Sequence, residues 1–225
     1  MQEPIYQKVV IDDPPDSTRG EKMEFHLVND GNLLKPAGSG GKKRVWEKHA
    51  IRGFLSSQLK RLWETHPALK SYAAKTIKID GSGNLHIPNI PFMDYLADGH
   101  RVGDLRIIPI ATEANGLVCS LEVLLLMPDF HGIMAHGDID NRLKTLLDAL
   151  KKPKNGMDVR KKEGDAPDPN PMYCLVEDDK QITGLTIRTD RLLYPMDGSQ
   201  DDAIIIIRVT TAQIDPFGSP WELHL

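Results

Sequence analysis

The sequence contains only two cysteines in 225 residues, Cys119 and Cys174, and they form no CxxC pair. This excludes a disulfide framework and a zinc ribbon, and it favours a reduced, cytoplasmic setting. Long apolar segments are also missing, because the longest runs, 123–127 and 203–207, are far shorter than a membrane span. The acidic first residues contain no apolar signal-peptide core. We therefore expect neither a secretion signal nor a membrane partner.

An excess of positive charge is absent as well, since the formal net charge is -4 at pH 7. Proteins that coat nucleic acid are usually basic throughout, so this composition argues against that class. The local charge differs from the total: residues 42–61 hold seven Lys or Arg against one Glu, and residues 151–163 hold six against two acids. Either patch alone is typical of a solvated surface, but such patches on an acidic body can attract phosphate.

The hydrophobic content of 40% is sufficient for a core. Apolar residues at helical spacing predict helices over 45–66, with Trp63 in the core and Trp46 left open, and over 138–152. Apolar runs and alternation predict strands, the last two forming an antiparallel pair; these strands cover 23–29, 117–127, 181–193 and 203–211.

The remaining segments suggest how the domain is organised. Residues 1–22 are expected to form an arm, which could be flexible, and residues 23–225 a single domain. Residues 73–116 are interpreted as an irregular insertion with short strands at 76–79 and 105–111. The segment 151–174 begins with a proline-rich, charged stretch and is expected to be a mobile loop.

Acidic residues next to a lysine are the strongest functional signal. Asp138 follows a glycine and suits a helix N-cap, while Asp140 lies in the first predicted turn and Lys144 one turn further on. Asp178 and Asp179 precede a predicted strand. Hard divalent ions bind through a few carboxylates, water and substrate phosphates, so this combination is typical of Mg²⁺-dependent phosphoryl transfer.

Each motif alone also has a structural explanation. Asp138 could only cap the helix, and Asp140 with Lys144 could be a helical ion pair worth about 0.3–0.5 kcal/mol. Asp178 and Asp179 could be turn residues. A transition-metal site at His131 and His136 is conceivable, but no third soft ligand lies nearby in the sequence.

Taken together, the motifs resemble the RusA family of Holliday junction resolvases. The resemblance rests on the run 138–144 (DxDNxxK), the triplet 148–150 (DAL) and the run 178–182 (DDxQI). It implies a compact α+β domain in which helices pack on a mixed sheet. It also implies metal binding by Asp138, Asp140 and Asp179, with Lys144 as the catalytic lysine.

The activity implied by the resemblance is Mg²⁺-dependent endonucleolytic cleavage of branched DNA by a homodimer, with the four-way junction of recombination and repair as substrate and Mn²⁺ as a substitute ion. The family's basic run before the motif is missing, because residues 131–137 contain no Lys or Arg. Phosphate contacts are therefore assigned to residues of the two basic patches, namely Lys42, Lys43, Arg44, Lys151 and Lys152. A nuclease for another branched DNA or RNA, and a non-catalytic DNA-binding or assembly protein of the same fold, remain as alternatives.

Overall fold

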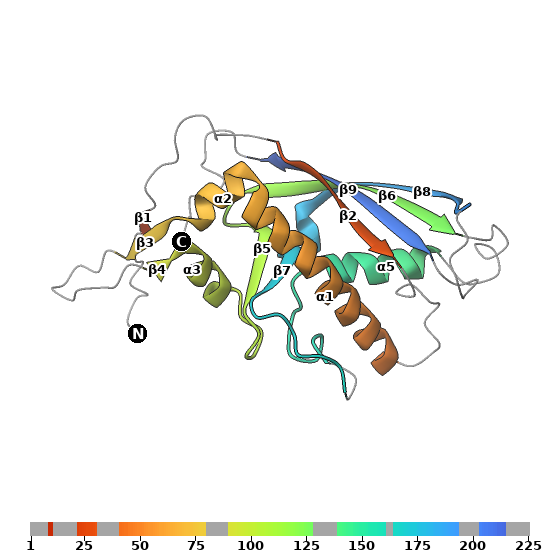
Figure 1. The fold of residues 1–225 in the computed structure, drawn as a ribbon, viewed down its shortest axis with the longest axis horizontal. Helices are drawn as coiled ribbons and strands as arrows, with labels where there is room; N and C mark the ends of the chain where they lie inside the picture. Colours follow the sequence, from red (N-terminus) through yellow and green to blue (C-terminus); the bar gives the residue numbers. More distant parts are fainter. Residues whose placement is uncertain are drawn as a thin grey trace, which may run out of the picture.

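The computed structural model describes residues 9–10, 22–30, 41–79, 90–127, 139–160, 164–193 and 203–214. They form an α+β fold in which helices pack on a mixed sheet (Figure 1). The elements are β1 (Val9–Val10), β2 (Glu24–Asp30), α1 (Gly41–Thr65), α2 (Pro67–Ala73), β3 (Thr76–Ile79), β4 (Ile90–Pro91), α3 (Phe92–Gly99), β5 (Ile107–Ala111), β6 (Leu117–Met127), α5 (Ile139–Leu150), β7 (Met172–Val176), the 3₁₀ turn η3 (Asp179–Gln181), β8 (Ile182–Arg191) and β9 (Ile204–Gln213).

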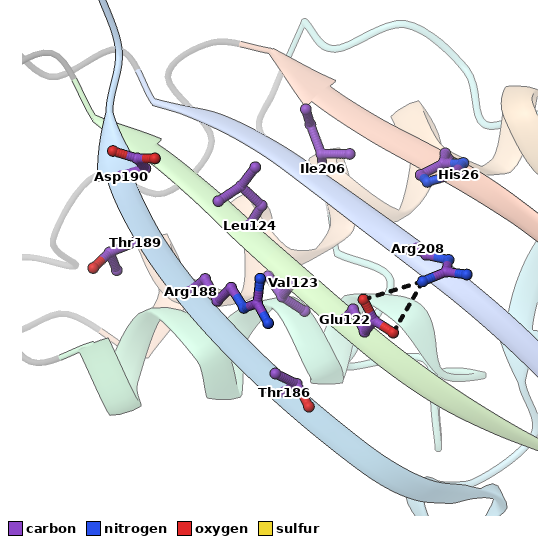
Figure 2. Close-up of a pocket in the computed structure, with 10 residues that line it drawn as sticks. All are labelled: His26, Glu122, Val123, Leu124, Thr186, Arg188, Thr189, Asp190, Ile206 and Arg208. Atoms are coloured by element: carbon purple, nitrogen blue, oxygen red, sulfur yellow. Dashed lines mark hydrogen bonds and ion pairs between the residues drawn. The ribbon is translucent and has the colours of Figure 1, made fainter.

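The main sheet has the strand order β2-β9-β6-β8, and β6 is its longest strand. β9 pairs with β6 in the antiparallel direction, whereas β8 pairs with it in the parallel direction. The helices α1 and α5 lie on one face of this sheet, and the opposite face is turned toward the viewer in Figure 2. The two faces of the sheet therefore have different surroundings.

The covered face of the sheet contributes to the main core. The helix α1 buries Ile51, Leu55, Leu59 and Trp63, which recur every four residues and so share one side of the helix. Pro67 ends this helix, as the sequence predicts, but it also occupies the first turn of α2, where a missing backbone N–H costs nothing. The core position predicted for Trp63 is confirmed.

A short parallel pair lies beside the main sheet. All residues of β5 are buried, and β5 pairs with β7, with Ile107 opposite Met172. The described part of residues 73–116 thus contains both expected short strands, as β3 and the fully buried β5, and adds the helix α3. Its status as an insertion into a family domain stays a prediction.

Two predicted features of the chain are wrong. The last two strands are not an antiparallel pair, because β6 lies between β8 and β9. The predicted loop 151–174 also extends too far, since Met172 and Cys174 lie in β7 and are buried. Before β7, the loop is attached to α1, where His49 Nε2 lies 2.9 Å from Asp168 Oδ1. Its predicted mobility is not tested.

Candidate functional site

One side of α5, together with the first residue after the helix, carries a row of alternating acidic and basic residues. Asp140, Lys144, Asp148 and Lys151 are separated by four, four and three residues, which places them within about 80° of one another around the helix axis. Lys144 is exposed, while Asp148 and Lys151 are partly buried. The helix rises about 12 Å between Asp140 and Asp148. The row therefore extends along most of the helix.

At the C-terminal end of α5, this row meets a carboxylate from another element. Lys151 Nζ lies 3.0 Å from Asp148 Oδ1 and 3.1 Å from Asp179 Oδ2. From α1, Lys48 Nζ approaches the other oxygen of Asp148 at 3.3 Å. We call these four side chains the Lys151 cluster. It brings together residues that are far apart in the sequence, with a lysine between two carboxylates.

The turn η3 gives Asp178 and Asp179 different roles. Asp178 caps the turn: its carboxylate accepts a hydrogen bond from Lys180 N, and its own N–H donates to Gln181 Oε1 at 2.7 Å. This is a reciprocal capping box, which fixes the backbone on both sides of Asp179. The Asp179 side chain points to Lys151 instead. The structural reading of Asp178 as a turn residue is therefore confirmed.

The ion pairs of the Lys151 cluster also affect its pKa values. A hydrogen bond involving Asp178 and the contact with Lys151 lower the pKa of Asp179. Burial raises the pKa of Asp148, but Lys151 and Lys48 outweigh this effect, so the pKa is lowered overall. Burial lowers the pKa of Lys151, but hydrogen bonds to the two carboxylates raise it by more. The charged forms of the two carboxylates and of Lys151 are thus stabilised near neutral pH.

A buried arginine fixes the end of α5 next to this cluster. Arg52 of α1 is only 3% exposed, and its guanidinium donates to Asp148 O at 2.9 Å, Asp158 O at 3.2 Å and Lys151 O at 3.3 Å. Two of these carbonyls belong to the last turn of α5 or the residue after it, where no helical N–H is available. Burial lowers the pKa of Arg52. In the sequence Arg52 resembles any other residue of the basic patch, so its structural role could not be found there.

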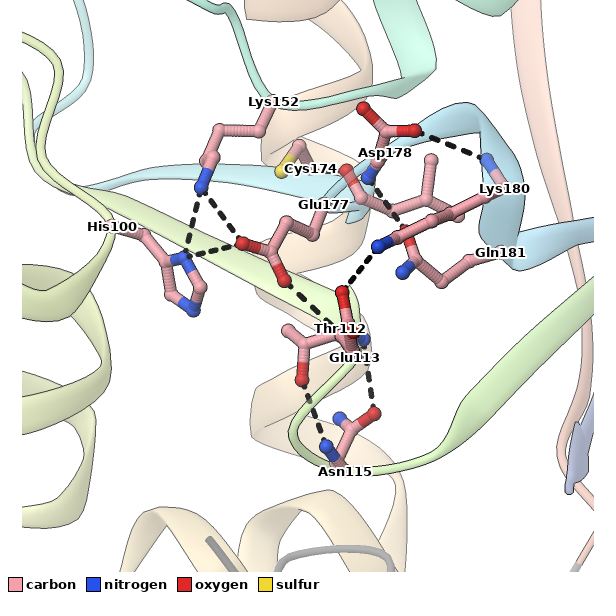
Figure 3. Close-up of polar contacts among 11 residues, drawn as sticks. His100, Thr112, Glu113, Asn115, Lys152, Cys174, Glu177, Asp178, Lys180 and Gln181 are labelled. Carbon is pink, nitrogen blue, oxygen red and sulfur yellow. Dashed lines mark hydrogen bonds and ion pairs between the residues drawn. The ribbon is translucent and has the colours of Figure 1, made fainter. Parts of the chain in front are cut away.

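Lys152, the residue after Lys151 in the chain, belongs to a second lysine cluster (Figure 3). Lys152 Nζ lies 3.0 Å from Glu177 Oε1 and 3.2 Å from His100 Nδ1. The other oxygen of Glu177 accepts the backbone N–H of Glu113 at 3.3 Å. We call Lys152, Glu177 and His100 the Lys152 cluster. It connects the segment after α5 with the segment after α3.

The structure describes only some of the predicted site residues, and those it describes lie at different points along α5. Asp138 lies outside the described residues, and of Asp140 only the backbone in the first turn of α5 is described. Asp179 contacts Lys151 near the C-terminal end of α5, about three turns from Asp140. Lys144 lies between the two ends.

The predicted phosphate-binding residues also divide into two groups. Lys42, Lys43 and Arg44 lie in the first turn of α1, and their side chains are outside the described part. Lys151 and Lys152 are described and are both paired with carboxylates. Their predicted contact with nucleic acid would therefore require each to exchange a carboxylate for a phosphate.

The described residues include no group of three or more His, Cys, Asp or Glu side chains arranged to hold a metal ion. Asp148 and Asp179 nevertheless approach the same lysine nitrogen, and their oxygens are the donor type that Mg²⁺ prefers. Of the other two acidic residues of the motif, Asp140 lies in the first turn of the same helix, and Asp138 lies outside the described residues. The donor chemistry therefore fits Mg²⁺.

Comparisons with protein-family models, curated proteins and solved structures found no match for this chain. Within the segments that the structure describes, every helix is too short or too polar to cross a membrane.

Proposed function

We propose that this protein is a Mg²⁺-dependent endonuclease of the RusA type that cleaves branched DNA, with the four-way Holliday junction as substrate. The observation that supports this most directly is the position of Asp179. It lies far from the α5 motif in the sequence, yet its carboxylate is 3.1 Å from a lysine in the acidic and basic row of that helix. Carboxylates and lysines from separate elements are what phosphoryl transfer requires.

In this proposal, Asp138, Asp140 and Asp179 would hold Mg²⁺, which would polarise the scissile phosphate and make a bound water more acidic. Because Asp179 contacts Lys151 about three turns from Asp140, it must leave that lysine and approach the start of α5 to complete the ligand set. Exposed Lys144, between the ends of the row, stabilises negative charge on the phosphate in the transition state. The hydrogen bond involving Asp178 and the contact with Lys151 lower the pKa of Asp179 and keep this carboxylate ionised. The site is thus prepared for a cation before the substrate binds.

The basic residues assigned from the sequence keep a supporting role in the proposal. Lys42, Lys43 and Arg44 at the start of α1 contact phosphates of the junction arms, and Lys151 and Lys152 contribute where the DNA passes α5. A homodimer has two sites related by a two-fold axis, which suits paired cuts in a four-way junction. The proposed setting is a reducing cytoplasm, which agrees with two free, buried thiols.

The test is cleavage of a labelled four-way junction beside a matched linear duplex, with Mg²⁺, with Mn²⁺ and with EDTA. We expect paired, metal-dependent cuts in the junction alone. Asp140→Asn and Asp179→Asn should each reduce cleavage at least ~100-fold while junction binding is kept, because each removes a ligand charge. Asp104→Asn, an exposed acid in a turn away from α5, is the matched control and should cleave normally.

The other outcomes separate the alternatives. An active Asp179→Asn protein contradicts the site assignment. Junction binding without cleavage in any metal indicates a non-catalytic DNA-binding or assembly protein. Metal-dependent cleavage of flaps or structured RNA, with intact four-way junctions, indicates a nuclease for another branched substrate.

A further inference from the structure

Among the described residues, no helix covers the face of the main sheet opposite α1 and α5, and we call it the open face; it has an apolar half. β6 contributes Leu124 and Leu126, and β9 contributes Ile206 and Ile204 directly opposite them. Val28 of β2 pairs with Ile206 and is 40% exposed. These five aliphatic side chains form a continuous patch over three neighbouring strands. It lies on the face opposite α1 and α5 (Figure 2).

The same strands are polar in their other half. On the open face, β6 continues with Glu122 and Ser120, which lie opposite Arg208 and Thr210 of β9. This half alternates between buried apolar and exposed polar residues, as expected for a sheet covered on one face only. In the apolar half, residues 123–127 and 204–207 are hydrophobic without interruption. Such runs are typical of strands that are covered on both faces.

Charges of both signs border the apolar half. Arg188 and Asp190 of β8 line a hollow of about 580 Å³ that also contains Leu124 and Ile206. On the other side, Arg208 lies 2.8 Å from Glu24 and 3.2 Å from Glu122. A nucleic acid would require an excess of positive charge here. An apolar centre with a mixed rim instead matches a protein interface.

We infer that a second copy of this chain docks on this open face, with its own apolar half against the first. Arg188 and Asp190 lie two residues apart on one strand, so a two-fold axis near them places each Arg188 against the partner's Asp190. Four strands of at least seven residues give a face of roughly 20 by 25 Å. With the relief of its side chains, this approaches the ~800 Å² that each partner contributes to a standard interface.

This inference deepens the proposed function, which assumes a homodimer, by assigning the surface that the two copies share. It can be tested separately, because the mass of the complex is measured without metal or DNA. A monomeric protein that still cleaves junctions, and a dimer that does not cleave, are then distinct results.

The experiment measures the mass of the full chain by sedimentation over a range of concentrations. The wild type should be a dimer, and Leu124→Asp should raise its dissociation constant about 30-fold or more, because it buries an unpaired charge at the centre of the patch. Phe54→Asp is the matched control: Phe54 is 41% exposed on α1, away from the open face. Its dissociation constant should be unchanged, and thermal melts verify that all variants fold.

A charge exchange then tests the orientation of the two copies. Arg188→Asp alone places like charges together and should weaken the dimer, whereas Arg188→Asp combined with Asp190→Arg should restore it. Restoration could not follow from misfolding. A wild type that is monomeric throughout, a Leu124→Asp protein that dimerises normally, or a double variant that stays weak would overturn the inference.

Discussion

Lys151 and Lys152 are adjacent in the chain, and each forms an ion pair, yet their surroundings differ. Lys151 Nζ is 3.1 Å from Asp179, whose side chain is 61% exposed. Lys152 Nζ is 3.0 Å from Glu177, which is 27% exposed and also accepts a backbone N–H. His100 lies beside the second pair, whereas in the first pair Lys151 has Asp148 as a second carboxylate partner. The acid of the first pair is therefore accessible to solvent and the acid of the second is shielded, although the Lys151 side chain, at 14% exposed, is less exposed than that of Lys152, at 23%.

The comparison shows that two lysines of one basic patch can have different roles. An exposed ion pair contributes little to stability, because water replaces it at small cost. A shielded pair cannot lose one member without leaving the other partly desolvated and unpaired. Lys151 is thus suited to exchange its carboxylate for a phosphate, and Lys152 to hold two segments together. The sequence alone does not distinguish the roles of the two lysines.

The largest effect should come from Arg52, which fixes the end of α5 from which both lysines extend. Arg52→Met removes the donor for three carbonyls and should lower the free energy of unfolding by about 3 kcal/mol. Urea denaturation measures this loss. Arg61→Met, exposed on the same helix, is the control and should change stability by less than about 0.5 kcal/mol. Equal losses for both variants would contradict the anchoring role.

Exchanging each lysine for an isosteric apolar residue sharpens the comparison directly. Lys152→Met should lower the free energy of unfolding by about 1–2 kcal/mol, because Glu177 loses its charged partner. Lys151→Met should cost less by the same measurement, because Asp148 keeps Lys48 as a partner and Asp179 is exposed to water. Junction affinity should show the reverse order, falling more for Lys151→Met than for Lys152→Met. If the two variants are equally stable, the different burial of the two ion pairs does not change what each contributes to stability.

The smallest effect is expected in the pH dependence of stability. Burial and the nearby charge of Lys152 lower the pKa of His100. Below about pH 6.5 the unfolded chain therefore binds a proton that the folded protein resists, and the free energy of unfolding falls as pH decreases. His100→Asn, which keeps an acceptor near Lys152, should flatten this part of the profile. The loss of stability due to Glu177, whose pKa is lowered, should remain at more acidic pH.

Much of the fold follows from local sequence patterns. The strand 117–127 is confirmed at both ends as β6, and the helices predicted over 45–66 and 138–152 correspond to α1 and α5. Their apolar spacing contains the necessary information. Strand neighbours do not follow from local patterns, so β8 and β9 resembled a hairpin although β6 separates them. The strand β7 is not predicted, because its five residues directly follow a proline-rich segment and are counted as part of that loop.

The candidate site could be predicted only in part for the same reason. The helical row from Asp140 through Asp148 follows from 3.6-residue periodicity. The approach of Asp179 to Lys151 depends on how β7 pairs with β5 and leads into η3, which is not encoded locally. The burial of Arg52 depends on the end of α5 packing against α1. Non-local contacts of this kind can be identified only in the folded structure.

The order of strands in the main sheet also constrains how the protein is made. β2 is an edge strand whose neighbour is β9. Glu24 pairs with Thr210 and Asp30 with Ile204, so β2 cannot pair until β9 has been made. About 180 residues separate the two strands, and a ribosome needs roughly 10–40 s to add that many residues. During this interval the N-terminal strand has no pairing partner in the sheet. The sheet can therefore close only after β9 has been synthesised, and a nascent chain that stops before residue 204 leaves β2 without its partner strand.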